Sequence, residues 1–253
     1  MYLASLILGG AVMAAALAAT PGLDADPPTV YVDVPVKRLA LNAAVAAGDV
    51  SMSLVGDNHT VTHVRLFLAN ETNKLLDLSI PAGQVFVPAD PSFQYMMVTE
   101  PARDVLTPDI DSEFRLTTVC ISPKSVKPPA PTSTYMVGQH PDERHEAECM
   151  QIIEIAKELD SSKAYDNVPI APERRAQTIA QLAIWMNQGE RSRNPDDKVT
   201  RKTIADDILR CAGKSRALLD PAERQTFDDF VDRVFKAIDL TRKQAVKKSI
   251  STN

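Results

Sequence analysis

Residues 64–98 read VRLFLANETNKLLDLSIPAGQVFVPADPSFQYMMV, in which short apolar runs alternate with turn-forming residues. Alternate side chains of a β-strand point to the same face of the sheet, so each run gives a strand with one apolar face. The residues that share such a face are Leu66 with Leu68, Leu76 with Leu78 and Ile80, and Phe93 with Tyr95 and Met97. Proline, glycine, aspartate and asparagine separate the runs and favour turns. The stretch predicts the centre of a β-sheet domain.

The same pattern continues on both sides of this stretch. The further segments with alternating apolar and polar residues are 50–55, 62–69, 102–106 and 114–121. Residues 29–41 form either a first strand or a linker. Short strands at intervals of about 8–12 residues are typical of an antiparallel sandwich. We therefore expect an Ig-like β-sandwich over residues 29–122.

The period of the apolar residues changes after a proline-rich connector, residues 123–139. Beyond it, apolar residues recur at the spacing of one helix face. The pattern predicts helices around residues 149–159, 179–186, 199–212 and 220–248. The last is the best defined, because Asp220, Pro221 and Glu223 supply an N-cap, a first-turn proline and a capping-box acid. We expect an α+β protein whose residues 140–253 form a four-helix region.

The amino terminus is apolar. Residues 1–19 carry no charge, and residues 20–28 form an acidic linker rich in proline. Ala16-Leu17-Ala18 offers a cleavage site of the signal-peptide kind. The alternative is an uncleaved transmembrane anchor, in which Gly10 and Ala14 would let a neighbouring helix approach closely. Both interpretations place the rest of the chain outside the cytoplasm, in the periplasm or at the cell surface.

Composition and motifs argue against several classes of function. The chain has 28 basic and 33 acidic residues and a net charge of −5, which does not suit a nucleic-acid partner. No Ser-His-Asp set, glycine-rich phosphate loop or carboxylate pair is recognisable. We expect a non-catalytic protein without a cofactor. It would bind or scaffold other membrane or extracytoplasmic proteins as an accessory subunit of a membrane-associated assembly. An enzyme of unrecognised type is one alternative.

Two groups of residues could hold a metal ion. Asp109, Asp111 and Glu113 alternate in TPDIDSE, which is either a calcium site or an acidic turn, since the spacing falls short of a twelve-residue calcium loop. His145 and Cys149 lie four residues apart on a predicted helix, with acidic residues nearby. They form either part of a zinc site or a solvated helix start.

Three cysteines in an exported chain leave at least one thiol unpaired. A disulfide between Cys120 and Cys149 would connect the last predicted strand to the first predicted helix, and the compartment would permit it. Cys211 would then be a buried free thiol.

The segment AQLAIW, residues 180–185, resembles the TQxAIW motif of thioester domains in bacterial surface adhesins. In that family a cysteine and a glutamine form an internal thioester that captures a host nucleophile. The resemblance implies a thioester between Gln181 and either Cys120 or Cys149, and hence a covalent adhesin. Ala180 replaces the threonine of the motif. The alternative is a helix whose tryptophan packs on the core.

A wider resemblance involves several segments. The leucine-rich strand followed by SIPAG, then Gln94, Cys120 and QLAIW, is similar to exported bacterial proteins of unknown function that join a sandwich to a helical region. This resemblance implies the compartment and the fold, and no activity.

Overall fold

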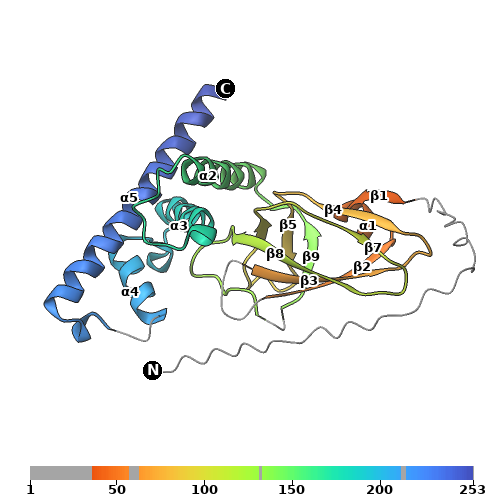
Figure 1. The fold of residues 1–253 in the computed structure, drawn as a ribbon, viewed down its shortest axis with the longest axis horizontal. Helices are drawn as coiled ribbons and strands as arrows, with labels where there is room; N and C mark the ends of the chain where they lie inside the picture. The colour runs from red at the N-terminus through yellow and green to blue at the C-terminus, as the bar shows by residue number, and fades with distance from the viewer. Residues whose placement is uncertain (1–35, 57–62, 131–132, 212–214, 253) are drawn as a thin grey trace, which may run out of the picture. The chain divides into compact units, whose positions relative to one another are not determined.

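The computed structural model describes residues 36–56, 63–130, 133–211 and 215–252 (Figure 1). They belong to one compact unit. The expected amino-terminal helix with Gly10 and Ala14, and the linker after it, lie outside the described residues. Within the described residues, no helix has the length and apolar character needed to cross a membrane.

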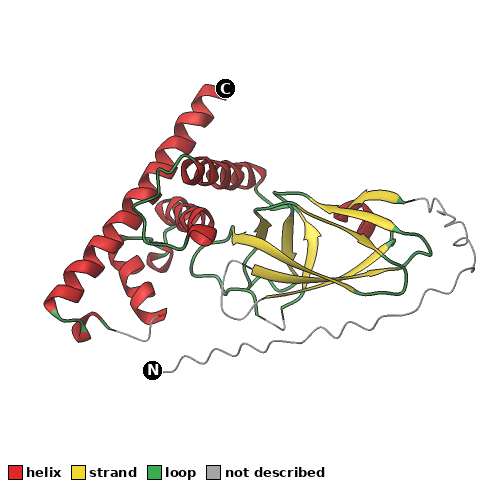
Figure 2. Ribbon diagram, in the orientation of Figure 1, coloured by secondary structure: helices red, strands yellow, loops and turns green. Residues whose placement is uncertain are grey.

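The β-strands form two sheets (Figure 2). The strands are β1 (Lys37–Ala40), β2 (Val50–Gly56), β3 (His63–Asn70), β4 (Leu76–Ile80), β5 (Val85–Pro88), β6 (Met96–Val98), β7 (Ala102–Leu106), β8 (Ser112–Cys120) and β9 (Tyr135–Gly138). A three-stranded sheet has the order β1-β4-β7, and a six-stranded sheet has the order β2-β3-β8-β6-β5-β9. Because β2 also contacts β9, the larger sheet is nearly closed, like a barrel.

One apolar core lies between the two sheets. Antiparallel pairing places Leu66 opposite Phe114 and Val64 opposite Leu116, and all four side chains are buried. The alternating leucines of β4 enter the same core. The α+β class is therefore confirmed, and so is the central β-region expected from residues 64–98.

Three features of the β-region differ from the expected Ig-like sandwich, which is not confirmed. Strand β1 pairs with β4 in parallel. Residues Leu41–Ala46 form a short helix, α1, which begins at the last residue of the segment 29–41 that was predicted as a first strand or a linker. Strand β9 lies within the expected connector, because its residues pair with β5 and its Tyr135 is buried.

The four predicted helices are confirmed. They are α2 (Glu143–Ser161), α3 (Pro172–Arg191), α4 (Arg201–Cys211) and α5 (Pro221–Thr252), with short 3₁₀ turns η1 (Pro195–Asp197) and η2 (Arg216–Leu218). The predicted capping box starts α5: Glu223 N–H donates to Asp220 at 2.8 Å, and Asp220 N–H donates to Glu223 at 3.0 Å.

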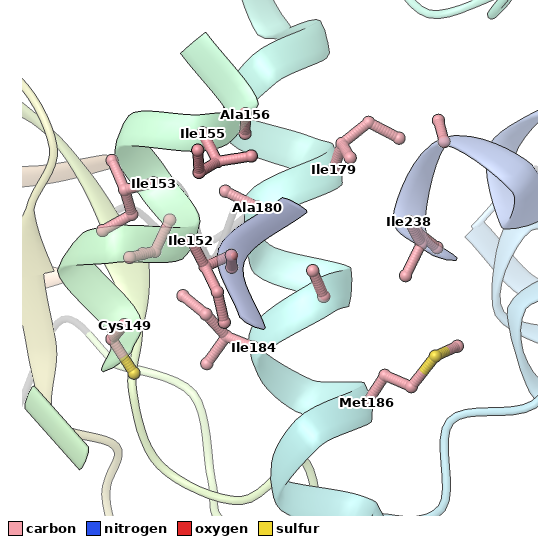
Figure 3. Close-up of a cluster of buried hydrophobic side chains, with 14 of the residues drawn as sticks. Cys149, Ile152, Ile153, Ile155, Ala156, Ile179, Ala180, Ile184, Met186 and Ile238 are labelled. Atoms are coloured by element: carbon pink, nitrogen blue, oxygen red, sulfur yellow. The ribbon is translucent and has the colours of Figure 1, made fainter. Parts of the chain in front are cut away.

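A second apolar core joins the helices to the sheet. Side chains of α2, α3 and α5 converge in it, as Figure 3 shows for Ile152, Ile184 and Ile238. Val119 and Ile121 of the β8 segment belong to this core, whereas Leu116 and Cys120 belong to the core between the sheets. The end of β8 is therefore buried on both faces.

Candidate functional site

The end of β8 contacts α3. Among the described residues, which omit 57–62, β3 pairs with β8 as far as His63 and Thr117. Beyond Thr117, Gln181 of α3 bonds to the backbone of β8. Its Oε1 accepts a hydrogen bond from Cys120 N–H at 2.6 Å, and its Nε2 donates to Cys120 O at 2.9 Å. One buried amide thus satisfies both backbone groups of Cys120, as a neighbouring strand would.

Two more glutamines of α3 make bonds of the same kind. Gln177 Nε2 donates to Thr118 O at 2.7 Å, and Gln188 Nε2 donates to Ile121 O at 2.6 Å. Residues four and seven positions apart on a helix lie on nearly the same face. We call Gln177, Gln181 and Gln188 the glutamine seam, because together they fix α3 along the edge of β8.

Both described cysteines are free thiols and buried, so the expected disulfide is absent from the structure. The reason is strand geometry: the Cys120 side chain enters the core between the sheets, and Cys149 enters the helical core on the other face of β8. Burial raises the pKa of the Cys120 thiol to about 12 and also raises that of Cys149. Both thiols are therefore protonated at neutral pH and are poor nucleophiles. The side chain of Cys211 lies outside the described part.

His145 does approach Cys149, as its position four residues earlier predicted. The His145 Nε2 atom lies 3.4 Å from Cys149 Sγ. The same nitrogen lies 2.8 Å from Ile121 O and 2.7 Å from Gln188 Nε2, so protein groups already surround it. Asp142 accepts a hydrogen bond from His145 N–H as the N-cap of α2. Across the described residues, no group of three or more His, Cys, Asp or Glu side chains could hold a metal ion.

The acidic turn before β8 does not gather its three carboxylates. The Glu113 carboxylate accepts two hydrogen bonds from Arg65, at 2.6 and 3.2 Å, and Arg65 lowers the pKa of that carboxyl. Asp109 stands in a left-handed turn with φ of 59°. Asp111 is exposed, and the three carboxylates do not form a group that could hold a metal ion in the described part of the chain.

A groove of about 950 Å³ is lined by the end of α2, the start of α3, strand β8 and the turn between β6 and β7. Buried Ile153 and Ala180 contribute apolar surface to it. The charged residues that line it are Glu100, Arg115, Lys157, Asp160, Glu173 and Arg174. Lys157 Nζ donates to Thr99 O at 2.5 Å, and Asp160 forms an ion pair with Arg175 at 2.8 Å. The groove therefore offers both signs of charge above an apolar surface.

Comparisons of the chain with protein-family models, with curated proteins and with solved structures gave no match. The resemblances described above thus rest on the residues alone.

The sequence pointed to part of this site. It singled out Gln181, Cys120 and the pair of His145 and Cys149, which the structure brings to the same end of β8. It missed Gln177, Gln188 and the groove. One signal was present, because the three glutamines recur along the face of α3 that carries Ile184 and Ala180. Polar residues at core-facing positions of a helix need partners.

Proposed function

We propose that this protein is a non-catalytic binding or scaffolding protein that holds a segment of a partner protein in the groove beside α2 and α3. The proposal includes attachment to a membrane through residues 1–19 and an extracytoplasmic location. An Ig-like relationship of the β-region is also part of it. The observation that carries the proposal is the groove itself, a recess beside the junction that the glutamine seam joins.

The lining of the groove suits a polypeptide better than a small reactive substrate. Binding sites of a few hundred to about 1,000 Å³ commonly combine apolar surface with a few polar groups that set orientation. Here Ile153 and Ala180 supply the apolar surface, and exposed Arg174, Glu173 and Glu100 supply charges of both signs. A segment with an aliphatic side chain between charged neighbours would complement this surface.

The first test is the substitution Arg174→Glu in the full chain. Arg174 is exposed at the start of α3 and lines the groove, so the change reverses a charge without disturbing a core. We expect the chain, extracted in mild detergent, to carry a stoichiometric partner, and the variant to bind that partner at least about tenfold more weakly. The affinity can be measured by surface plasmon resonance with the purified partner.

The matched control is Arg193→Glu. Arg193 is exposed in the turn after α3 and does not line the groove. We expect this variant to bind like the native chain. Equal affinity of both variants, or a native chain that is isolated without any partner, would contradict the proposal.

A second candidate function is covalent adhesion through a thioester, because the amide of Gln181 bonds to the backbone of Cys120, and these are two of the residues that the adhesin resemblance implies. In that reaction Cys120 Sγ would attack Gln181 Cδ. The C–N bond of the amide would break, a C–S bond would form, and the thiol proton would leave with ammonia. Complete burial of Cys120 argues against a bond that an external nucleophile must reach.

Mass spectrometry separates the two functions. A thioester predicts that the intact native chain is lighter by one ammonia than its sequence requires, and that methylamine opens the thioester and adds its own mass as an N-methylamide of Gln181. Cys120→Ser should abolish both effects. The binding proposal predicts a chain with the full mass, and no reaction with methylamine.

A further inference from the structure

Two histidines meet where the chain passes from β9 into α2. The ring centroids of His140 and His145 are 4.9 Å apart in an edge-to-face arrangement, and Tyr95 packs against His140 at 5.0 Å. Both histidines are half-buried. They lie beside the end of β8, because His145 contacts Ile121 O and also Gln188 of the glutamine seam.

His140 is bonded in a way that requires a neutral ring. Its Nδ1 accepts a hydrogen bond from Asp142 N–H at 3.1 Å, which a protonated nitrogen cannot do. After protonation, Nδ1 could donate only to Asp142 O at 3.2 Å, and the amide of the α2 N-cap would lose its acceptor. Burial is the main reason that the pKa of His140 lies below its usual value.

His145 lies between two groups with opposite requirements. An Nε2 without a proton accepts from Gln188 Nε2 at 2.7 Å, whereas an Nε2 that carries a proton donates to Ile121 O at 2.8 Å and repels the Gln188 amide hydrogens. Turning that amide over would offer Oε1 to the ring N–H. It would also place Oε1 in the position 2.6 Å from Ile121 O that Nε2 now holds, so two oxygens would face each other. When the neutral ring carries its proton on Nδ1, protonation of Nε2 therefore removes one bond between α3 and β8 in either arrangement.

The charged groups around the pair do not remove this conflict. Asp142 and Glu146 of α2 are near enough to favour a proton on His140, and His145 opposes it. Glu148, the residue before Cys149, is already paired with Arg191 of α3 at 2.7 Å. The remaining neighbours are Tyr95, the Cys149 thiol and the carbonyl of Ile121. Two protonated rings in edge contact would add a further repulsion.

We propose that His140 and His145 form a pH-responsive contact, and that acidification separates α2 and the end of α3 from β8 and exposes the Cys149 thiol. Cys149 is 1% exposed and lies 3.4 Å from His145 Nε2, so its access to solvent reports directly on this contact. The inference concerns the junction and does not depend on the proposed binding function.

The test is the rate at which 4,4′-dithiodipyridine labels Cys149 in the full chain carrying Cys211→Ser. The rate is followed from about pH 7.5 to about pH 5, where histidine titrates. Thiol reactivity itself falls about tenfold for each unit by which the pH is lowered, because the thiolate is the nucleophile. Opening of the contact can rise by at most about tenfold per proton taken up and per pH unit. With both rings taking up a proton, we expect labelling to accelerate on acidification, by at most about tenfold per pH unit. The same chain with Cys149→Ser supplies the background from Cys120.

Substitutions of the two histidines and of Gln188 test whether protonation of the histidines causes the faster labelling of Cys149. His140→Gln and His145→Asn should each weaken the acceleration, and the double variant should abolish it. Gln188→Ala should raise labelling at all pH values, because it removes the bond that the proton would break. A native rate that stays flat or falls as the pH is lowered, or a double variant that keeps the acceleration, would overturn the proposal.

Discussion

At the residue scale, Gln181 is the side chain on which the junction depends most. Cys120 is buried, so its N–H and C=O groups have no access to water and rely on the Gln181 amide. A buried backbone group without a partner costs about 1–3 kcal/mol. The same two bonds explain why a glutamine occupies a core-facing position of α3 without implying any chemistry.

The substitution Gln181→Ala should therefore destabilise the chain by about 2–4 kcal/mol, since two backbone groups lose their partners. Urea unfolding followed by circular dichroism measures the change. Gln244→Ala is the control, because Gln244 is exposed on α5, and we expect an effect within about 0.5 kcal/mol. Similar stabilities of the two variants would refute the role of Gln181.

His140 should make overall stability depend on pH. Its pKa in the folded chain is lowered, mainly by burial, so the unfolded chain binds more protons in the acidic range. Stability is then fully present above the unfolded value of about 6.5 and decreases as pH falls towards the folded pKa. Urea midpoints across this range should show the decrease, and His140→Gln should make it smaller. An unchanged slope in the variant would contradict this assignment.

At the element scale, the contact between α3 and η1 requires a glycine. A Cβ at Gly189 would collide with the backbone carbonyl of Asp197, and backbone cannot move aside as a flexible side chain can. Lys198 Nζ reinforces this contact by donating to Ser192 O at 2.8 Å. The close approach of the two elements thus explains a glycine in the last turn of α3, where it is a poorer helix former than alanine.

We predict that Gly189→Ala destabilises the chain, although alanine is the better helix former. Helix propensity favours the change by about 1 kcal/mol, but overpacking against backbone costs about 1–3 kcal/mol. The reciprocal control is Ala147→Gly on the exposed face of α2, where propensity alone predicts a loss of about 1 kcal/mol. Thermal unfolding compares the two variants, and a stabilised Gly189→Ala chain would show that the collision is relieved easily.

Local patterns were sufficient to predict most elements. The alternating leucines of β4, the helical spacing of α2 and the capping box of α5 are properties of neighbouring residues, so the sequence displays them directly. Strand β9 and helix α1 were missed because each is short and is held by distant partners. For β9 these are β5 and the bond from Tyr135 OH to Gln94 O at 3.0 Å.

The site was harder to predict than the elements. The sequence does not show that the end of β8 lies beside α3, where the glutamine seam bonds to its backbone. It likewise does not show that Cys120 and Cys149, which are free thiols in the structure, belong to different cores.

At the scale of the whole molecule, the end of β8 couples the two cores. Its side chains alternate between the core of the sheets and the core of the helices, so neither core is complete without it. Together with the glutamine seam, this arrangement predicts that the β-region and the helical region unfold together. Loss of tertiary structure around Trp185, measured by fluorescence, should coincide with the loss of β-structure measured by circular dichroism. Two separate transitions would contradict this coupling.

A groove lined by charged residues and two protonated thiols favour the binding proposal over covalent chemistry. The most direct test is native mass spectrometry of the full chain in mild detergent, compared with its Arg174→Glu variant. We expect a complex of the native chain with a stoichiometric partner, a chain mass that retains the Gln181 amide, and loss of the partner from the variant. A native chain without a partner, or one lighter by one ammonia, would contradict it.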